Sequence, residues 1–325
     1  MKFSAKKAFL LGVAAGLSAL QCHSQILTLE GQTGGFITPT AYVVYSAPGK
    51  TFSHPAVGYH FVNASSVIGN VHTFSITEGF ANRGEVGYTR SVHMLGDSAA
   101  FSSLWHYAGM DIVHGKVVAI KDGQFGAWTP GVAGGFVVRT GDKFVSGALN
   151  QAETGTLKSY TNGDVYAVAT KTWLHPPVPF LLNFGLKFTN ASIFGLGGQA
   201  TRFGGRLFGG LGIPIPGPFH TAIVPAMGFT QEPPQVKNLS PILVDPNTLA
   251  PNAPAHIPTT LDYAVRVTQK DNPHFAFDIG VGHVAGTIGT TAVATGLPAP
   301  YPPYVLVPVD LKANNVIGMG LSLRY

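Results

Sequence analysis

Histidine and acidic side chains are the residues of this sequence that could carry acid–base chemistry. The chain has twelve histidines, and none of them belongs to an HExxH helix motif or to a Cys/His zinc set. Two His–Asp pairs remain candidates for hydrolysis at the rim of a barrel: His106 with Asp111, and Asp278 with His283. A histidine hydrogen-bonded to its surroundings is the simpler explanation of each pair. We therefore predict no catalytic residues, no metal site and no cofactor.

Six charged residues lie on the less apolar side of segments in which apolar and polar residues alternate. They are Lys187, Arg206, Asp262, Arg266, Asp278 and Arg324. Successive side chains of a strand point to opposite faces of the sheet, so these charges would share the inner face of a closed sheet. We predict that they line its lumen, where they either form a ladder of ion pairs or bias the passage of ions.

The elements that must position these charges are predicted to be strands. In the segment 180–191, Leu182, Phe184, Leu186 and Phe188 share one face, and Asn183, Gly185, Lys187 and Thr189 share the other. Similar segments predict twelve strands, at 55–63, 69–77, 84–92, 104–120, 127–139, 163–173, 180–191, 203–215, 219–230, 258–268, 273–284 and 316–325. The fold class is therefore all-β. We expect a transmembrane, antiparallel, up-and-down barrel of about 12 strands, with about 10 and about 14 as the limits.

The connections between these segments alternate in length. Short connections rich in Gly, Pro, Asn or Asp are expected at 78–83, 121–126, 174–179, 216–218 and 269–272. Long ones are expected at 140–162, 231–257 and 285–315, whereas 64–68, on the same side, is short. Turns at one mouth and loops at the other are typical of outer-membrane barrels. The Pro-rich connection 231–257 is either an external cover or an inward constriction, and a further strand at 305–311 is an open alternative.

The last nine residues, 317–325, alternate without exception and end on Tyr325. Such a strand resembles the closing strand of bacterial outer-membrane barrels. It predicts outer-membrane lipid and the barrel-insertion machinery as partners. Trp105, Trp128 and Trp173 each lie at the end of a predicted strand, and with Tyr325 they are the expected membrane-interface aromatics.

Residues 1–24 have the pattern of a cleaved secretory signal, with Lys2, Lys6 and Lys7 before an uncharged apolar stretch. Cleavage after Ser24 would remove Cys22, the one cysteine of the chain. The alternative is a lipoprotein acylated at Cys22. After the signal, we expect residues 25–54 to form a plug or a first strand in the lumen, and residues 55–325 to form the barrel.

Composition supports the membrane location. Charged residues make up 11% of the chain, against about 25% in an average soluble domain. Without the three lysines of the signal, the formal charge of +5 falls to +2, so no basic surface for nucleic acid is expected. Outside the signal no apolar run has the length of a membrane helix, so strands are the expected spanning elements.

A family resemblance begins at the sequence GQTGGFITPTA, residues 31–41, and extends to Gly58-Tyr59 and to the run from Gly84 to Tyr88. It resembles the start of YjbH-like outer-membrane barrels, and this resemblance implies a link to exopolysaccharide production. The remainder resembles transporter-like barrels.

The prediction from the sequence is thus a porin-like protein of the cell outer membrane in a Gram-negative envelope. We expect a passive pore or channel for small solutes. A structural or export component of envelope or exopolysaccharide assembly, and a rim-located outer-membrane hydrolase, remain the alternatives. Small solutes or polysaccharide would be further partners.

Overall fold

Strands account for almost all regular structure in the part of the chain that can be described. The computed structural model describes residues 27–64, 69–94, 109–141, 161–173, 179–191, 199–236, 243–251, 253, 255–269, 274–284, 286–296, 302–310 and 315–324. Among these residues, no helix is both long and apolar enough to cross a membrane.

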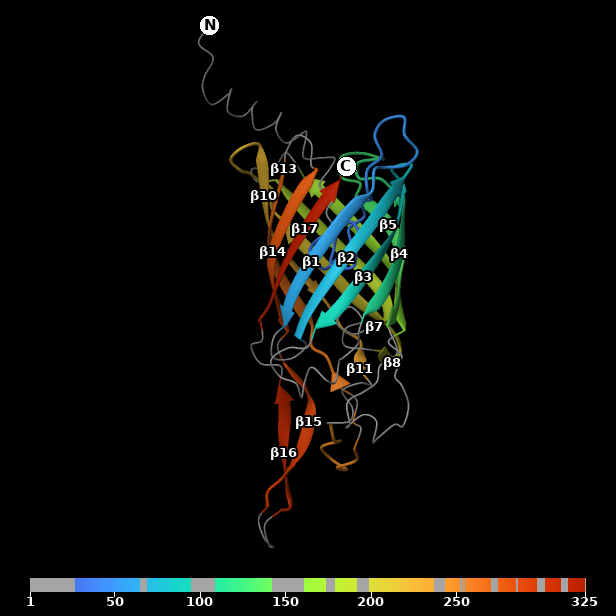
Figure 1. Ribbon diagram of the computed structural model, residues 1–325. Helices are drawn as coiled ribbons and strands as arrows, with labels where there is room; N and C mark the ends of the chain where they lie inside the picture. The colour runs from blue at the N-terminus through green and yellow to red at the C-terminus, as the bar shows by residue number, and fades with distance from the viewer. Residues whose placement is uncertain are drawn as a thin grey trace.

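Within the described residues, twelve strands form one antiparallel barrel (Figure 1). They are β1 (Ala56–Ala64), β2 (Gly69–Phe80), β3 (Gly84–Met94), β4 (Met110–Ile120), β5 (Gly131–Gly141), β6 (Asn162–Trp173), β7 (Phe180–Ala191), β8 (Gln199–Gly212), β10 (Thr221–Thr230), β13 (Thr260–Gln269), β14 (Phe275–Val284) and β17 (Asn315–Arg324). Pairing of β1 with β17 and of β8 with β10 completes the ring. The predicted fold class is therefore confirmed.

The two faces of the barrel wall differ as alternation requires. On β7, Phe184, Leu186 and Phe188 are each more than half exposed on the outer face, whereas Asn183 and Thr189 are buried on the inner face. The outer face of the other strands carries a similar set of exposed apolar side chains, among them Phe74, Ile76, Val117, Val138, Val165, Tyr263 and Ile279. The wall is therefore apolar toward its surroundings and mixed in character toward its lumen.

Successive connections between wall strands lie at alternate mouths of the barrel. At the proximal mouth, where β1 begins and β17 ends, the connections are 81–83, 121–130, 174–179, 213–220 and 270–274. At the distal mouth they are 65–68, 95–109, 142–161, 192–198, 231–259 and 285–314. The three longest connections, 142–161, 231–259 and 285–314, lie at the distal mouth as predicted, but the alternation is incomplete, because 65–68 and 192–198 at that mouth are shorter than 121–130 and 213–220 at the other.

Several predicted strand ends need correction. The turn after β4 runs to 130, because Gly123 and Gly126 adopt positive φ and the Gly123 N–H donates to Thr129 O at 2.9 Å. Trp128 therefore lies in a turn and does not start a strand. The strand expected from 104 is seen from Met110, since 95–108 lie outside the described residues.

Five shorter strands are not part of the wall's ring. They are β9 (Ile215–Pro216), β11 (Pro234–Val236), β12 (Ala255–His256), β15 (Thr287–Ala294) and β16 (Tyr304–Asp310). The last two pair only with each other within the described sheets and project beyond the distal mouth (Figure 1). The additional strand considered at 305–311 thus belongs to this outer hairpin and leaves the barrel at twelve strands.

Candidate functional site

The segment 27–46, hereafter the lumen segment, lies inside the barrel. Its first residue, Leu27, is fully buried, and the Leu27 N–H donates to Ser322 Oγ at 3.4 Å. Near its other end, Tyr45 O accepts a hydrogen bond from Arg324 Nη2 at 2.9 Å. Ser322 and Arg324 both lie at the end of β17. The lumen segment therefore enters and leaves through the proximal mouth.

The lumen segment folds on itself. Its β-bridges join Leu27 to Thr33 and Gly34 to Pro39, so both are internal to the segment. Gly31 has a φ of 87°, and a Cβ there would lie 2.4 Å from Thr89 Oγ1 on the wall. Only glycine combines this backbone conformation with so close an approach. The first glycine of the GQTGGFITPTA motif is thereby explained by a turn against the wall.

Wall side chains satisfy the backbone carbonyls of the lumen segment. Within the barrel a carbonyl without a partner would be costly, because little water is available to replace one. The donors are Thr89 Oγ1 to Glu30 O (2.9 Å), Thr77 Oγ1 to Gly31 O (2.6 Å), Lys116 Nζ to Thr33 O (2.9 Å), Arg266 Nη1 to Gly34 O (3.0 Å) and Asn183 Nδ2 to Pro39 O (2.9 Å). These contacts come from five different wall strands, so the segment is held from around the lumen.

A buried ion-pair cluster holds the one acidic side chain of the lumen segment. Arg139 on β5 donates through Nε and Nη2 to the two carboxylate oxygens of Glu30, at 2.5 and 2.8 Å. Its Nη2 also reaches Asp164 Oδ2 on β6 at 2.6 Å. Thr189 on β7 donates to the other oxygen of Asp164. The Arg139 side chain is only 1% exposed, so this guanidinium serves two carboxylates away from water.

A second buried ion pair belongs entirely to the wall. Lys116 Nζ on β4 lies 3.0 Å from Glu85 Oε1 on β3, and both side chains are fully buried. The Glu85 carboxylate accepts the Thr33 N–H and hydroxyl, at 3.0 and 2.5 Å, and the Val44 N–H at 3.1 Å. This pair therefore binds the lumen segment mainly through its backbone.

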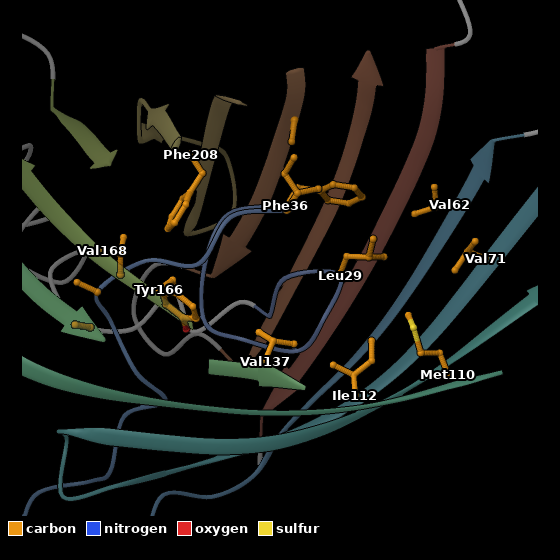
Figure 2. Close-up of a cluster of buried hydrophobic side chains, with 14 of the residues drawn as sticks. Leu29, Phe36, Val62, Val71, Met110, Ile112, Val137, Tyr166, Val168 and Phe208 are labelled. Carbon is orange, nitrogen blue, oxygen red and sulfur yellow. The ribbon is translucent and has the colours of Figure 1, made fainter. Parts of the chain in front are cut away.

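Apolar side chains of the lumen segment pack against the inner face of the wall. Figure 2 shows Leu29 and Phe36 of the segment among wall residues that include Ile112, Tyr166 and Phe208. The inner face of the wall thus carries large apolar residues besides polar and small ones. Large apolar residues are tolerated on it because the lumen segment covers them.

The lumen segment is also bonded at the proximal mouth. The Tyr42 hydroxyl donates to Asp122 Oδ2 at 2.9 Å and lies 2.6 Å from Thr172 Oγ1. Burial raises the pKa of the Tyr42 phenol, which therefore stays protonated and can donate to the carboxylate. Lys171 Nζ reaches the other oxygen of Asp122 at 2.5 Å. The turn 121–130 is thus tied to the segment.

A small cavity remains between the lumen segment and the wall. Its volume is about 30 Å³, which is room for one or two water molecules. Its polar lining consists of Glu30, Gln32, Thr38, Asp164, Tyr166, Lys187 and Thr230. Two of these buried groups, Gln32 Nε2 and Tyr166 OH, have no hydrogen-bond partner among the described residues. The cavity is therefore suited to water or to a small polar solute.

The structure brings together two of the six charged residues predicted for the lumen. Arg266 and Asp278 are cross-strand neighbours on β13 and β14, joined by hydrogen bonds of 2.7 and 3.0 Å. Because Arg266 also donates to Gly34 O, this pair contributes to the hold on the lumen segment.

The other four predicted residues are placed differently. Lys187 and Arg206 are cross-strand neighbours on β7 and β8, so two cations lie side by side on the wall. Arg324 binds the carbonyl of Tyr45. Asp262 is buried, and its Oδ1 has no hydrogen-bond partner within the described part of the chain.

Sequence reasoning missed the residues that bind the lumen segment most directly. These are Glu30, Glu85, Lys116, Arg139 and Asp164. The four wall residues carried a usable signal, because each is a charge on the inner face of an alternating strand, as Lys187 is. Glu30 carried none, since the lumen segment has no strand period.

The predicted interface aromatics that can be described share the proximal mouth. The ring centroids of Trp128 and Trp173 are 6.4 Å apart, and Phe180 stacks on Trp173 at 4.7 Å. Trp105 and Tyr325 lie outside the described residues.

The two hydrolytic pairs gain no support from the geometry. Asp111 lies on the outer face, where it binds Arg90 at 3.0 Å and Tyr88 OH at 2.5 Å, and His106 lies outside the described residues. Asp278 is bound by Arg266 on the inner face, whereas His283 falls on the outer face by alternation. Within the described ranges no three His, Cys, Asp or Glu side chains are grouped as metal ligands would be.

Comparison with known proteins finds similarity at the level of structure. No family model matches the chain, and no curated protein matches it. Two solved structures that are similar are described as "KdgM porin" and "KdgM porin in complex with disordered oligogalacturonate". The first is 10% identical, with a TM-score of 0.43, and the second 9% identical, with a TM-score of 0.41. Each match covers 83% of this chain and 99% of the other.

Proposed function

We propose that this protein is an outer-membrane channel for small solutes whose lumen is closed, in the conformation described, by the lumen segment. Residues 1–24 act as the export signal in this proposal, and no catalytic step is involved. The apolar outer face of the wall supports a membrane location, since side chains such as Phe184, Leu186 and Phe188 would otherwise be exposed to water. Trp128 and Trp173 at one mouth fit the headgroup level of a bilayer.

The observation that carries the channel proposal is a set of buried polar groups on the inner wall that bind no atom of the described residues. Thr73 Oγ1, Ser91 Oγ, Thr260 Oγ1 and Asp262 Oδ1 are buried, and none of them has a hydrogen-bond partner among the described residues. In a dry interior each would cost about 1–3 kcal/mol, and more for a charged group. Water would bind these groups once the lumen segment moved aside, so they support an aqueous path through the open barrel.

Passage of a solute requires the lumen segment to move. The segment crosses the lumen, and the cavity beside it has a volume of only about 30 Å³. Because its bridges are internal, it can leave without breaking the hydrogen-bond ladders between wall strands. Displacement through the proximal mouth is therefore compatible with an intact barrel.

A reversible disulfide tests this proposal. A Cβ at Gly131 on β5 would lie 3.5 Å from Ala41 Cβ, a distance that a disulfide can bridge. The variant is Ala41→Cys/Gly131→Cys with Cys22→Ser. The control is Gly212→Cys/Ala226→Cys, which joins β8 to β10 across 3.9 Å without touching the lumen segment.

Conductance in planar lipid bilayers is the measurement. We expect discrete steps from the wild type and from the reduced variant, and loss of at least about 90% of openings after oxidation, an effect equivalent to about 1.4 kcal/mol. Oxidation of the control should change little. Equal conductance of the oxidised and reduced variant would show that passage does not need the segment to move. No conductance from any form, including one lacking residues 27–46, would overturn the channel proposal and favour the envelope-assembly role implied by the YjbH-like resemblance.

A further inference from the structure

We propose that the wall contains a binding site for a small carboxylate, which the chain's own Glu30 occupies in the closed conformation. The inference names the class of solute that would open the lumen, and in this respect it rests on the proposed function. The site itself is a matter of binding and can be tested without any transport. Three features of the wall support it: its charge, the geometry around Arg139 and the cavity beside Glu30.

The charge of the wall near Glu30 favours an anion. Arg139, Lys187 and Arg206 lie on the inner face of β5, β7 and β8, whereas Asp164 on β6 is the acidic wall residue that Arg139 binds. Lys187 lies close enough to act electrostatically on the carboxylates of Glu30 and Asp164. Without the lumen segment, this part of the wall therefore has more cations than anions. Glu30 supplies a second negative charge beside that of Asp164.

Glu30 is set apart from the rest of the lumen segment by its charge. It is the only Asp, Glu, Lys or Arg between residues 27 and 49. The segment is otherwise held through its backbone carbonyls and amides, the neutral hydroxyls of Thr33 and Tyr42, and apolar packing. A single ionic contact from an otherwise uncharged segment is the part of the closed state that a dissolved anion could replace.

The geometry at Arg139 is that of carboxylate recognition. Its Nε and Nη2 donate to the two oxygens of Glu30 in a fork, at 2.5 and 2.8 Å. A planar guanidinium presents the same pair of donors to any carboxylate, and such bidentate hydrogen bonds are among the stronger ones in proteins. A solute R–COO⁻ that takes this fork would leave the Glu30 side chain without its partner.

The cavity beside Glu30 provides space and further donors. Gln32 Nε2 and Tyr166 OH line it, are buried, and have no hydrogen-bond partner within the described residues. Together with Lys187 they could bind the polar substituents of a solute. Glu30 itself lines the cavity. Displacement of the Glu30 carboxylate would therefore join the space that it vacates to the cavity. Unused donors next to the fork distinguish this site from a purely structural ion pair.

The closed state is thus autoinhibited by an internal ligand. A carboxylate bound to Arg139 replaces the ion pair between Arg139 and Glu30 of the lumen segment, whereas a neutral solute of the same size does not. Carboxylate-bearing solutes are therefore the class that would release the segment and pass through the barrel.

The test restores the missing carboxylate from solution. In Glu30→Ala the fork of Arg139 is vacated, and sodium acetate has the size and charge to fill it. We expect acetate to raise the Tm of the detergent-solubilised Glu30→Ala barrel, with half of the effect in the millimolar range. Acetamide, which has the same shape without the charge, should bind at least about tenfold more weakly. The wild type, whose fork is occupied by Glu30, should respond much less.

The control variant is Glu30→Ala/Arg139→Gln, in which acetate should lose its effect. Sodium chloride at matched ionic strength corrects for screening. If Glu30→Ala does not fold, Glu30→Ser leaves a hydroxyl in the vacated space and serves in its place. Equal shifts with acetate and acetamide, or a shift that persists without Arg139, would overturn the inference. Because the measurement is of binding, that outcome would leave the channel proposal to be decided separately by the conductance of the disulfide variant.

Discussion

Two buried ion-pair clusters hold the lumen segment, and they do so by different means. At Arg139 the wall binds a side chain of the segment, Glu30, through a forked pair of hydrogen bonds. At Lys116 and Glu85 the ion pair is complete within the wall and binds the segment through Thr33 and its backbone. Loss of the segment would therefore leave Arg139 paired with Asp164 alone, with the fork to Glu30 vacant, and would leave the Lys116–Glu85 pair intact.

The difference indicates which contact can be regulated. A backbone contact such as Lys116 Nζ to Thr33 O depends on the position of the segment and only weakly on its sequence. The contact between Arg139 and Glu30 depends on one carboxylate, which a solute can imitate. A solute carboxylate can therefore compete with Glu30 for Arg139 and release the segment. The contacts of Lys116 and Glu85 instead favour the return of the segment to the same position.

The largest effect should come from Arg139→Met, which leaves the carboxylates of Glu30 and Asp164 buried without their cation. We expect a loss of about 5 kcal/mol, at the upper end for a broken buried pair. Denaturant unfolding of the barrel in lipid vesicles measures it. The matched control is Arg90→Met, because Arg90 and Asp111 form a partly exposed pair on the outer face. The control should lose less, because Asp111 lies near the distal end of β4 and keeps the hydrogen bond from Tyr88 OH. Equal losses would refute the view that the inner cluster is stabilising.

A smaller effect is expected from Lys116→Met. The Glu85 carboxylate then loses its cation but keeps three hydrogen bonds from Thr33 and Val44. We expect a loss of about 3 kcal/mol in the same unfolding experiment.

The double variant Lys116→Met/Glu85→Gln sharpens this result. It has no buried charge left at the pair, so it should recover part of the stability lost in the single variant. A double variant less stable than Lys116→Met would show that the carboxylate of Glu85 stabilises the segment without its lysine.

The smallest effect is expected from Asn183→Ala, which removes the hydrogen bond from Asn183 Nδ2 to Pro39 O and the one that Asn183 Oδ1 accepts from Thr170 Oγ1. All of these groups are neutral, so the loss should be about 1–2 kcal/mol. Openings in planar bilayers should become more frequent, because the closed state is weakened while the wall ladders stay intact. A loss as large as that of Lys116→Met would contradict the distinction between ionic and backbone contacts.

Much of the wall could be predicted from the sequence. Alternation on segments such as 180–191 indicated both the strands and their two faces, and the three longest connections were expected at the mouth where they lie. The predicted start of β5, at residue 127, was wrong, because positive φ at Gly123 and Gly126 extends the turn to residue 130. The strands and their two faces could be predicted because they depend on the period of two along each strand, which is a local property of the sequence.

The partners of the charged residues were decided by the tertiary structure. Alternation placed Arg266 and Asp278 on one face, but their pairing depends on the register of β13 against β14. Glu30 meets Arg139 across a separation of 109 residues, through a segment without a strand period.

The sequence by itself determined that this chain closes into a barrel with an apolar outer face, because alternation along each strand obliges the two faces of the wall to differ. It did not determine what fills the lumen. That depends on where strand tilt and register bring inner side chains of distant strands, and on which backbone groups of the lumen segment they can reach. Such distances exist only after the barrel has closed, so the closed lumen is a property of the tertiary structure.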